Sequence, residues 1–151
     1  MNISSHDQQS EEMTPLMEEL FKLSEQFFFA YGSFLPHGAF LNDAGQVNLV
    51  GAAPEQNMTN ATEVLPMIHA GLRSVTAKST TRAVGVSESV FIGHNRTPAI
   101  KVLLEHRDGL TMALYKPWKK RFLRAPFFGA MDGQVAEPEV GGWTGPVNIS
   151  A

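Results

Sequence analysis

Hydrophobic residues recur every three or four positions from Thr14 to Tyr31, which predicts an amphipathic helix. Thr14 and Pro15 form a start signal. The threonine side chain can accept a hydrogen bond from a backbone N–H of the first turn. Proline at the first helical position has no backbone N–H, but an N–H at that position would have no partner within the helix. Gly32 follows where helices commonly end in the left-handed conformation. The apolar stripe consists of Leu16, Leu20, Leu23, Phe27 and Tyr31.

A β-hairpin is predicted in the stretch HGAFLNDAGQVNLVGA, residues 37–52, where two runs of alternating apolar residues flank a polar loop. If the loop consists of residues 43–45, Asp-Ala-Gly, its glycine takes the left-handed position that such loops need. This choice pairs Leu41 with Val47 and collects the apolar side chains on one face. We therefore expect two antiparallel strands after the first helix.

A second helix and a long strand are predicted in the middle of the chain. Thr62 can cap a helix whose apolar residues again lie three or four positions apart. The stretch 80–93 then alternates valine and isoleucine with smaller residues, which predicts a strand. Ala83 and Gly85 leave one face of this strand open to the close approach of a helix.

The charged run EHRD, which begins at Glu105, lies between two apolar strands predicted in the stretch 101–118. A two-residue turn would set charges against apolar residues across the hairpin. A three-residue turn, 107–109, pairs His106 with Leu110 and collects the apolar residues on one face. The pattern favours the second turn, so we expect Glu105 to point outward and His106 to point toward the core.

These elements indicate one α+β domain, residues 13–131, with the element order α-β-β-α-β-β-β. An antiparallel sheet of about five strands, packed with two helices, is the simplest way to bury both helix stripes. A further edge strand is indicated at residues 121–130, because Pro126 cannot donate in a central strand. Residues 1–12 are polar without periodicity and 132–151 are rich in glycine and proline, so we expect a disordered N-terminal tail and a loop-like or disordered C-terminal tail.

The element order and the hairpin at residues 37–52 together resemble those of roadblock and profilin-like domains. This resemblance implies a roadblock/profilin-like arrangement of the sheet and helices as an alternative architecture. It covers the order of the elements and one hairpin, and it transfers no functional residue to this chain.

Composition indicates the size of the domain, the kinds of site it can contain and its cellular location. The chain has 151 residues, of which 43% are hydrophobic, and this is enough for the core of one domain. Cysteine is absent, which excludes a disulfide framework, a thiolate nucleophile and a cysteine zinc site, and fits the reducing cytoplasm. No segment has the pattern of a signal peptide or a membrane span. We therefore expect a cytoplasmic protein that is not bound to a membrane.

Catalytic motifs are largely excluded. The run Gly85–Ser89, GVSES, lacks the second glycine of a nucleophile elbow and continues into a strand. There is no phosphate-binding glycine loop, and the five histidines include no pair spaced for joint metal binding on one strand or helix. We therefore predict no catalytic residue, no metal and no cofactor. The candidate pocket residues are His37 and His106, both predicted on the apolar face of a strand, with Glu105 beside them.

A basic stretch, YKPWKKRFLR, interleaves aromatic residues with cations and is the candidate interaction surface. Aromatic and basic residues together suit single-stranded nucleic acid, but the net charge of −3 disfavours it. The alternative interpretation is a hairpin connection whose lysines protect a sheet edge. The residues are Tyr115, Lys116, Trp118, Lys119, Lys120, Arg121 and Arg124.

The leading functional hypothesis is a non-enzymatic protein-interaction or adaptor module, homodimeric or bound to another protein. Leu103, Ala113 and Tyr115, predicted to face away from the main core, would form its apolar patch. The alternative is a small-molecule-binding protein or enzyme with a pocket near His37 and His106. A weaker alternative is an inhibitor or immunity-type protein that acts through the basic loop 116–124.

Overall fold

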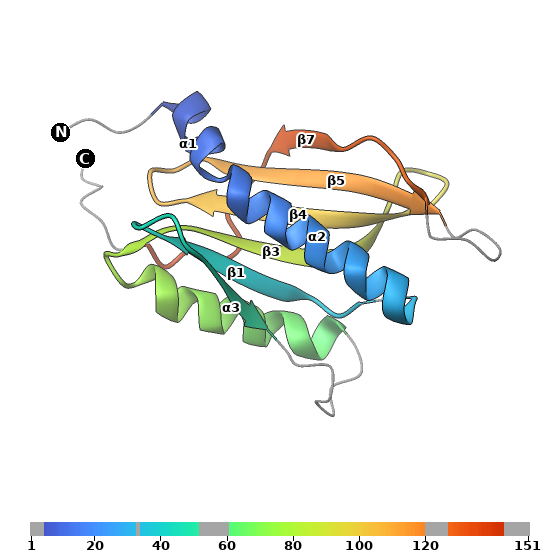
Figure 1. Ribbon diagram of the computed structural model, residues 1–151, viewed down its shortest axis with the longest axis horizontal. Helices are drawn as coiled ribbons and strands as arrows, with labels where there is room; N and C mark the ends of the chain where they lie inside the picture. Colours follow the sequence, from blue (N-terminus) through green and yellow to red (C-terminus); the bar gives the residue numbers. More distant parts are fainter. Residues whose placement is uncertain (1–4, 33, 52–60, 120–126, 144–151) are drawn as a thin grey trace.

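The computed structural model describes residues 5–32, 34–51, 61–119 and 127–143, and shows an antiparallel sheet with a long helix on each face (Figure 1). The helices are α1 (His6–Glu12), α2 (Thr14–Tyr31) and α3 (Ala61–Thr76). The strands are β1 (His37–Asn42), β2 (Val47–Gly51), β3 (Thr81–Ile92), β4 (Thr97–His106), β5 (Thr111–Lys119), β6 (Phe127–Phe128) and β7 (Asp132–Val135).

The sheet order is β2-β1-β3-β4-β5, and β6 and β7 each pair with β5. The pairing of β1 with β3 joins the two strand groups, which are separated in the chain by α3. The predicted α+β class, single domain and central order of elements are confirmed. β6 lies within the further edge strand predicted at residues 121–130, β7 is a strand beyond those predicted, and α1 is a third helix.

Both predicted hairpin registers are confirmed. In the first hairpin Leu41 pairs with Val47, and Gly45 takes a positive φ of 82° in the loop. In the second, the backbone N–H of His106 donates to Leu110 (2.8 Å), and Gly109 takes a φ of 116°. Alternation of apolar residues predicted both registers, because a shift by one residue would turn each strand's apolar side chains to the other face.

One face of the sheet packs against α2. Leu20 is fully buried at the centre of this core. A Cβ atom added to Gly85 would lie 2.5 Å from the Leu20 Cδ1 atom, so the absence of a side chain at Gly85 lets the helix approach β3. The close approach predicted from the small residues of this strand is therefore present. α2 ends at Tyr31, and Gly32 caps it in the left-handed conformation as predicted. The predicted capping role of Thr14 is wrong, because Met13 is the N-cap residue without a side-chain hydrogen bond and the Thr14 hydroxyl donates to the carbonyl of Ser10 (3.4 Å).

The other face packs against α3 and against the segment 136–143, which we call the strap. Val140 of the strap is 2% exposed and lies in one cluster with Leu72 of α3 and Val86 of β3. The expectation of a loop-like or disordered tail at 132–151 is corrected for residues 132–135, which form β7. The strap is loop-like as expected, but it is ordered against the second core, and residues 144–151 lie outside the described residues.

The N-terminal expectation is also corrected. Residues 6–12 form α1 instead of a disordered tail. Gln9 is 1% exposed, and its side-chain oxygen accepts the N–H of Leu110 at the start of β5 (2.8 Å). A polar helix of seven residues is marginal by itself, so contacts with the sheet, of which this hydrogen bond is one, stabilise it.

Candidate functional site

His37 lies in a buried polar cluster between α2 and the sheet. Its Nε2 atom is 3.3 Å from Ser24 Oγ, which is 2.6 Å from Ser87 Oγ, and its Nδ1 atom is 3.2 Å from the carbonyl oxygen of Leu35. Ser24 and Ser87 have no exposed surface. A substrate would not reach these hydroxyls in this conformation, so the cluster is a set of satisfied polar groups within the core.

Lowering the pH should weaken the fold through His37. Burial lowers the pKa of its imidazole below the ordinary value of 6.5, although hydrogen bonds to the carbonyls of Leu35 and Leu20 oppose this shift. The unfolded chain therefore takes up the proton first. The stability that the neutral His37 imidazole contributes to the fold is fully present above pH 6.5, and it is lost as the pH falls from 6.5 through the lower folded-state pKa.

Urea denaturation of His37→Gln at a series of pH values, between about pH 5 and 8, would check this expectation. The free energy of unfolding of this variant should depend less on pH than that of the wild type. The control is His94→Gln, which removes an exposed histidine from the turn after β3. Identical pH profiles for the wild type and His37→Gln would show that this imidazole does not contribute.

His106 points toward the α2 face, as predicted, and is 2% exposed. Its Nδ1 atom accepts the N–H of Asp108 (3.0 Å), so Nε2 carries the proton and donates to Glu12 Oε1 (2.8 Å). Glu12 also forms an ion pair with Arg82 (3.4 Å). His106 therefore ties α1 to the β4–β5 hairpin, which is a structural role.

Glu105 points to the opposite face and is 1% exposed, so the prediction that it points outward to solvent is wrong. Its carboxylate accepts three consecutive backbone N–H groups of the strap, from Glu139 (2.7 Å), Val140 (2.7 Å) and Gly141 (3.0 Å). Charge-assisted hydrogen bonds of this kind are stronger than neutral ones. Glu105 is thus the anchor of the strap on the sheet.

The three predicted pocket residues are not brought together. His37 pairs with Ser87 of β3, and His106 pairs with Ala83, four residues away along the same strand. The offset of the two histidines along the direction of β3 is roughly 13 Å. Glu105 lies on the other face of the sheet, where it binds the strap. The structure therefore shows no pocket common to these three residues.

The predicted apolar surface patch is also corrected. Leu103 and Ala113 do face away from α2, but each is only 2% exposed, because the second face of the sheet has a core of its own. Tyr115 is half-buried on that face, opposite Lys101. The patch is therefore not available as a binding surface.

The predicted basic surface is divided between the two faces of β5. Lys116 lies on the α2 face, where its ammonium is 2.6 Å from Glu25 Oε2 and 4.6 Å from the centre of the Phe21 ring. Trp118 packs on Phe28, with ring centres 4.1 Å apart. Lys119 is exposed at the end of β5. Lys120, Arg121 and Arg124 lie outside the described residues.

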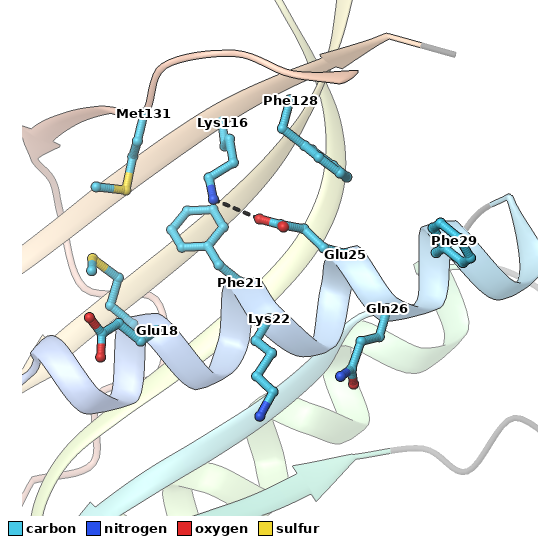
Figure 2. Close-up of a pocket in the computed structure, with 10 residues that line it drawn as sticks. Glu18, Phe21, Lys22, Glu25, Gln26, Phe29, Lys116, Phe128 and Met131 are labelled. Atoms are coloured by element: carbon cyan, nitrogen blue, oxygen red, sulfur yellow. Dashed lines mark hydrogen bonds and ion pairs between the residues drawn. The ribbon is translucent and has the colours of Figure 1, made fainter. Parts of the chain in front are cut away.

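A groove lies between α2 and the β5 edge of the sheet, and we call it the α2 groove (Figure 2). Its volume is about 560 Å³. Methionine and phenylalanine side chains form its floor, and the Lys116–Glu25 ion pair crosses it. Phe29 stands at one end and is 72% exposed. The groove is lined by Met17, Glu18, Phe21, Lys22, Glu25, Gln26, Phe29, Lys116, Phe128 and Met131.

Of the residues that line this groove, Lys116 alone belongs to the interaction surface predicted from the sequence. Phe29 was the available signal, because it lies outside the apolar stripe of its helix, on the side with the charged residues. Phe128 and Met131 reach the groove only because the chain returns to pair with β5. The edge strand predicted at residues 121–130 includes Phe128, but no local pattern indicates that it lies beside α2.

A second hollow, of about 530 Å³, lies on the opposite face near Lys101 and Tyr115. The Lys101 ammonium is 3.0 Å from Glu139 of the strap and 3.9 Å from Glu88. Burial raises the pKa of the Glu88 carboxyl, and the neighbouring Lys101 ammonium opposes that shift. The Lys101 charge is thus occupied in holding the strap to the sheet.

Within the described ranges, no three His, Asp or Glu side chains are grouped so that they could hold a metal ion. No helix of the described chain is long and apolar enough to span a membrane. Comparison of the chain with protein-family models, curated proteins and solved structures finds no match. The resemblance to roadblock and profilin-like domains therefore stays a prediction.

Proposed function

We propose that this chain is a non-enzymatic, cytosolic protein-interaction module and that the α2 groove is its binding surface. The observation that carries the proposal is an apolar floor of phenylalanine and methionine, open to solvent and bordered by charged residues. Binding interfaces typically combine an aromatic- and methionine-rich centre with a polar rim. Methionine side chains in addition adapt to partners of different shape.

The exposure of large apolar side chains supports the choice of the α2 groove as the binding surface. Phe29 and Met131, at 72% and 44% exposed, are large apolar side chains on the same groove. Covering such residues with a partner removes apolar surface from water, which favours association by about 25 cal/mol for each Å² buried. A grouped set of this kind indicates a contact surface more strongly than isolated exposed residues do.

The alternative hypotheses have weaker support. A small-molecule site near His37 and His106 would need these residues to converge, and they are separated along β3. An inhibitor or immunity-type function through the basic loop 116–124 depends largely on residues outside the described ranges. A binding surface in the α2 groove requires neither the convergence of the two histidines nor residues outside the described ranges.

Site-specific photo-cross-linking in cells would test the proposed function. A photoreactive phenylalanine analogue placed at Phe29 should form a discrete adduct with a polypeptide, because the partner covers this side chain. The matched control is the same analogue at Phe91 of β3, which is 59% exposed and lies outside the groove. Equal labelling at both positions, or no adduct at Phe29, would argue against a binding surface in the α2 groove.

A further inference from the structure

The outer side of α2 carries a self-complementary arrangement of residues. Glu18, Lys22, Glu25 and Phe29 follow one another at intervals of four, three and four residues, which places them in one stripe along the side of the helix that borders the α2 groove. The interval pattern is the same when it is read in either direction. Two copies of the stripe can therefore match residue for residue when the helices run antiparallel.

In such a pairing Lys22 of one copy lies opposite Glu25 of the other, and the two-fold axis repeats the contact. Phe29 of each copy lies opposite Glu18 of the other, next to Met17 on the groove floor. Within the stripe, no two like charges lie opposite each other in this register. A two-fold interface needs this reciprocity, because residue i contacts j and j contacts i.

Lys22 and Glu25 of the stripe both have capacity for a further ion pair. Lys22 forms no ion pair with any residue of the described chain, and in Figure 2 its side chain points away from Lys116. Glu25 binds Lys116 through Oε2, which leaves Oε1 to accept a second ammonium group. A carboxylate has acceptor capacity for both donors. The charges thus favour a partner that offers a lysine and a carboxylate at the spacing of α2 itself.

We propose that the occupant of the α2 groove is a second copy of this chain, with the two α2 helices antiparallel across a two-fold axis. This inference rests on the proposed function, since it names the partner of the same groove. Phe29 of each copy covers the floor of the other's groove at Met17, and two Lys22–Glu25 ion pairs set the register.

Sedimentation equilibrium of the full chain and of charge-reversed variants tests the proposal. The wild type should form a dimer whose population rises with concentration. Lys22→Glu and Glu25→Lys each create two like-charge contacts per dimer, so each should weaken self-association about tenfold or more. A mixture of the two variants should form heterodimers, because opposite charges then meet at both contacts. Lys78→Glu, which reverses an exposed lysine after α3, should leave the dimer unchanged.

The possible results separate this inference from the proposed function. A wild type that stays monomeric at all concentrations, or a dimer that is insensitive to Lys22→Glu, would overturn docking of a second copy on α2. If Phe29 then cross-links to a different polypeptide, the groove remains a binding surface with another partner. Thermal unfolding of each variant alone shows whether Glu25→Lys still folds without its bond to Lys116, and Lys22→Glu tests the register without affecting that bond.

Discussion

Glu105→Gln should lower the free energy of unfolding by about 3 kcal/mol, because buried hydrogen bonds to a charged group contribute roughly 1.5–3 kcal/mol each and this carboxylate accepts three. Glutamine has nearly the same shape but only one acceptor oxygen. Its NH₂ group would face backbone N–H donors of the strap. Urea denaturation, extrapolated to water, measures the difference.

The control for Glu105→Gln is Glu137→Gln, which removes an exposed carboxylate from the same strap and should change stability by less than about 0.5 kcal/mol. Hydrogen exchange adds a local readout, since the amides of Glu139, Val140 and Gly141 should exchange faster in Glu105→Gln. Unchanged protection of these three amides would show that the strap is held mainly by other contacts, such as that of Arg73 Nε with the carbonyl of Val140 (2.8 Å).

Leu20→Ala should also cost about 3 kcal/mol, since leucine-to-alanine changes in protein cores cost roughly 2–5 kcal/mol. Leu20 is fully buried and fills the space that Gly85 leaves between α2 and β3. Alanine would leave a cavity at the centre of the contact that positions the groove-forming helix. Chemical denaturation of the variant measures the loss.

Leu49→Ala on β2 is the matched control for Leu20→Ala, because this leucine is 54% exposed. It should lose much less stability than the buried site. Equal losses at Leu20 and Leu49 would mean that α2 is not packed on the sheet as the structure describes.

Local patterns predicted those parts of the fold that depend on neighbouring residues. The helical period predicted α2, although its buried face is turned toward Phe21, Ser24 and Phe28 and leaves Tyr31 of the predicted apolar stripe 68% exposed. Gly32 ends the helix in the left-handed conformation that glycine favours. Gly45 and Gly109 mark the two hairpin turns, and apolar alternation selects their registers. Each of these features joins positions that are close in sequence, so a short window contains the information.

The site depended on contacts between distant parts of the chain. Glu105 was expected on a solvent face because its strand alternates regularly, but the strap, more than 30 residues later, covers that face and supplies three donors. His37 and His106 share a face as the alternation implies, yet their distance along the sheet follows from the pairing of both strands with β3. Periodicity indicates which face a residue occupies and does not indicate what covers that face.

The amino-acid pattern alone therefore establishes the α+β class, the central order of elements, both hairpin registers and the small face of β3 that admits α2. Tertiary contacts determine the structure of α1 and of the strap, and they determine the location of the α2 groove. The physical reason is that α1 and the strap have little intrinsic preference for order and gain stability only by covering polar and apolar groups of a sheet already formed. The groove likewise exists only where Phe128 and Met131 return beside α2.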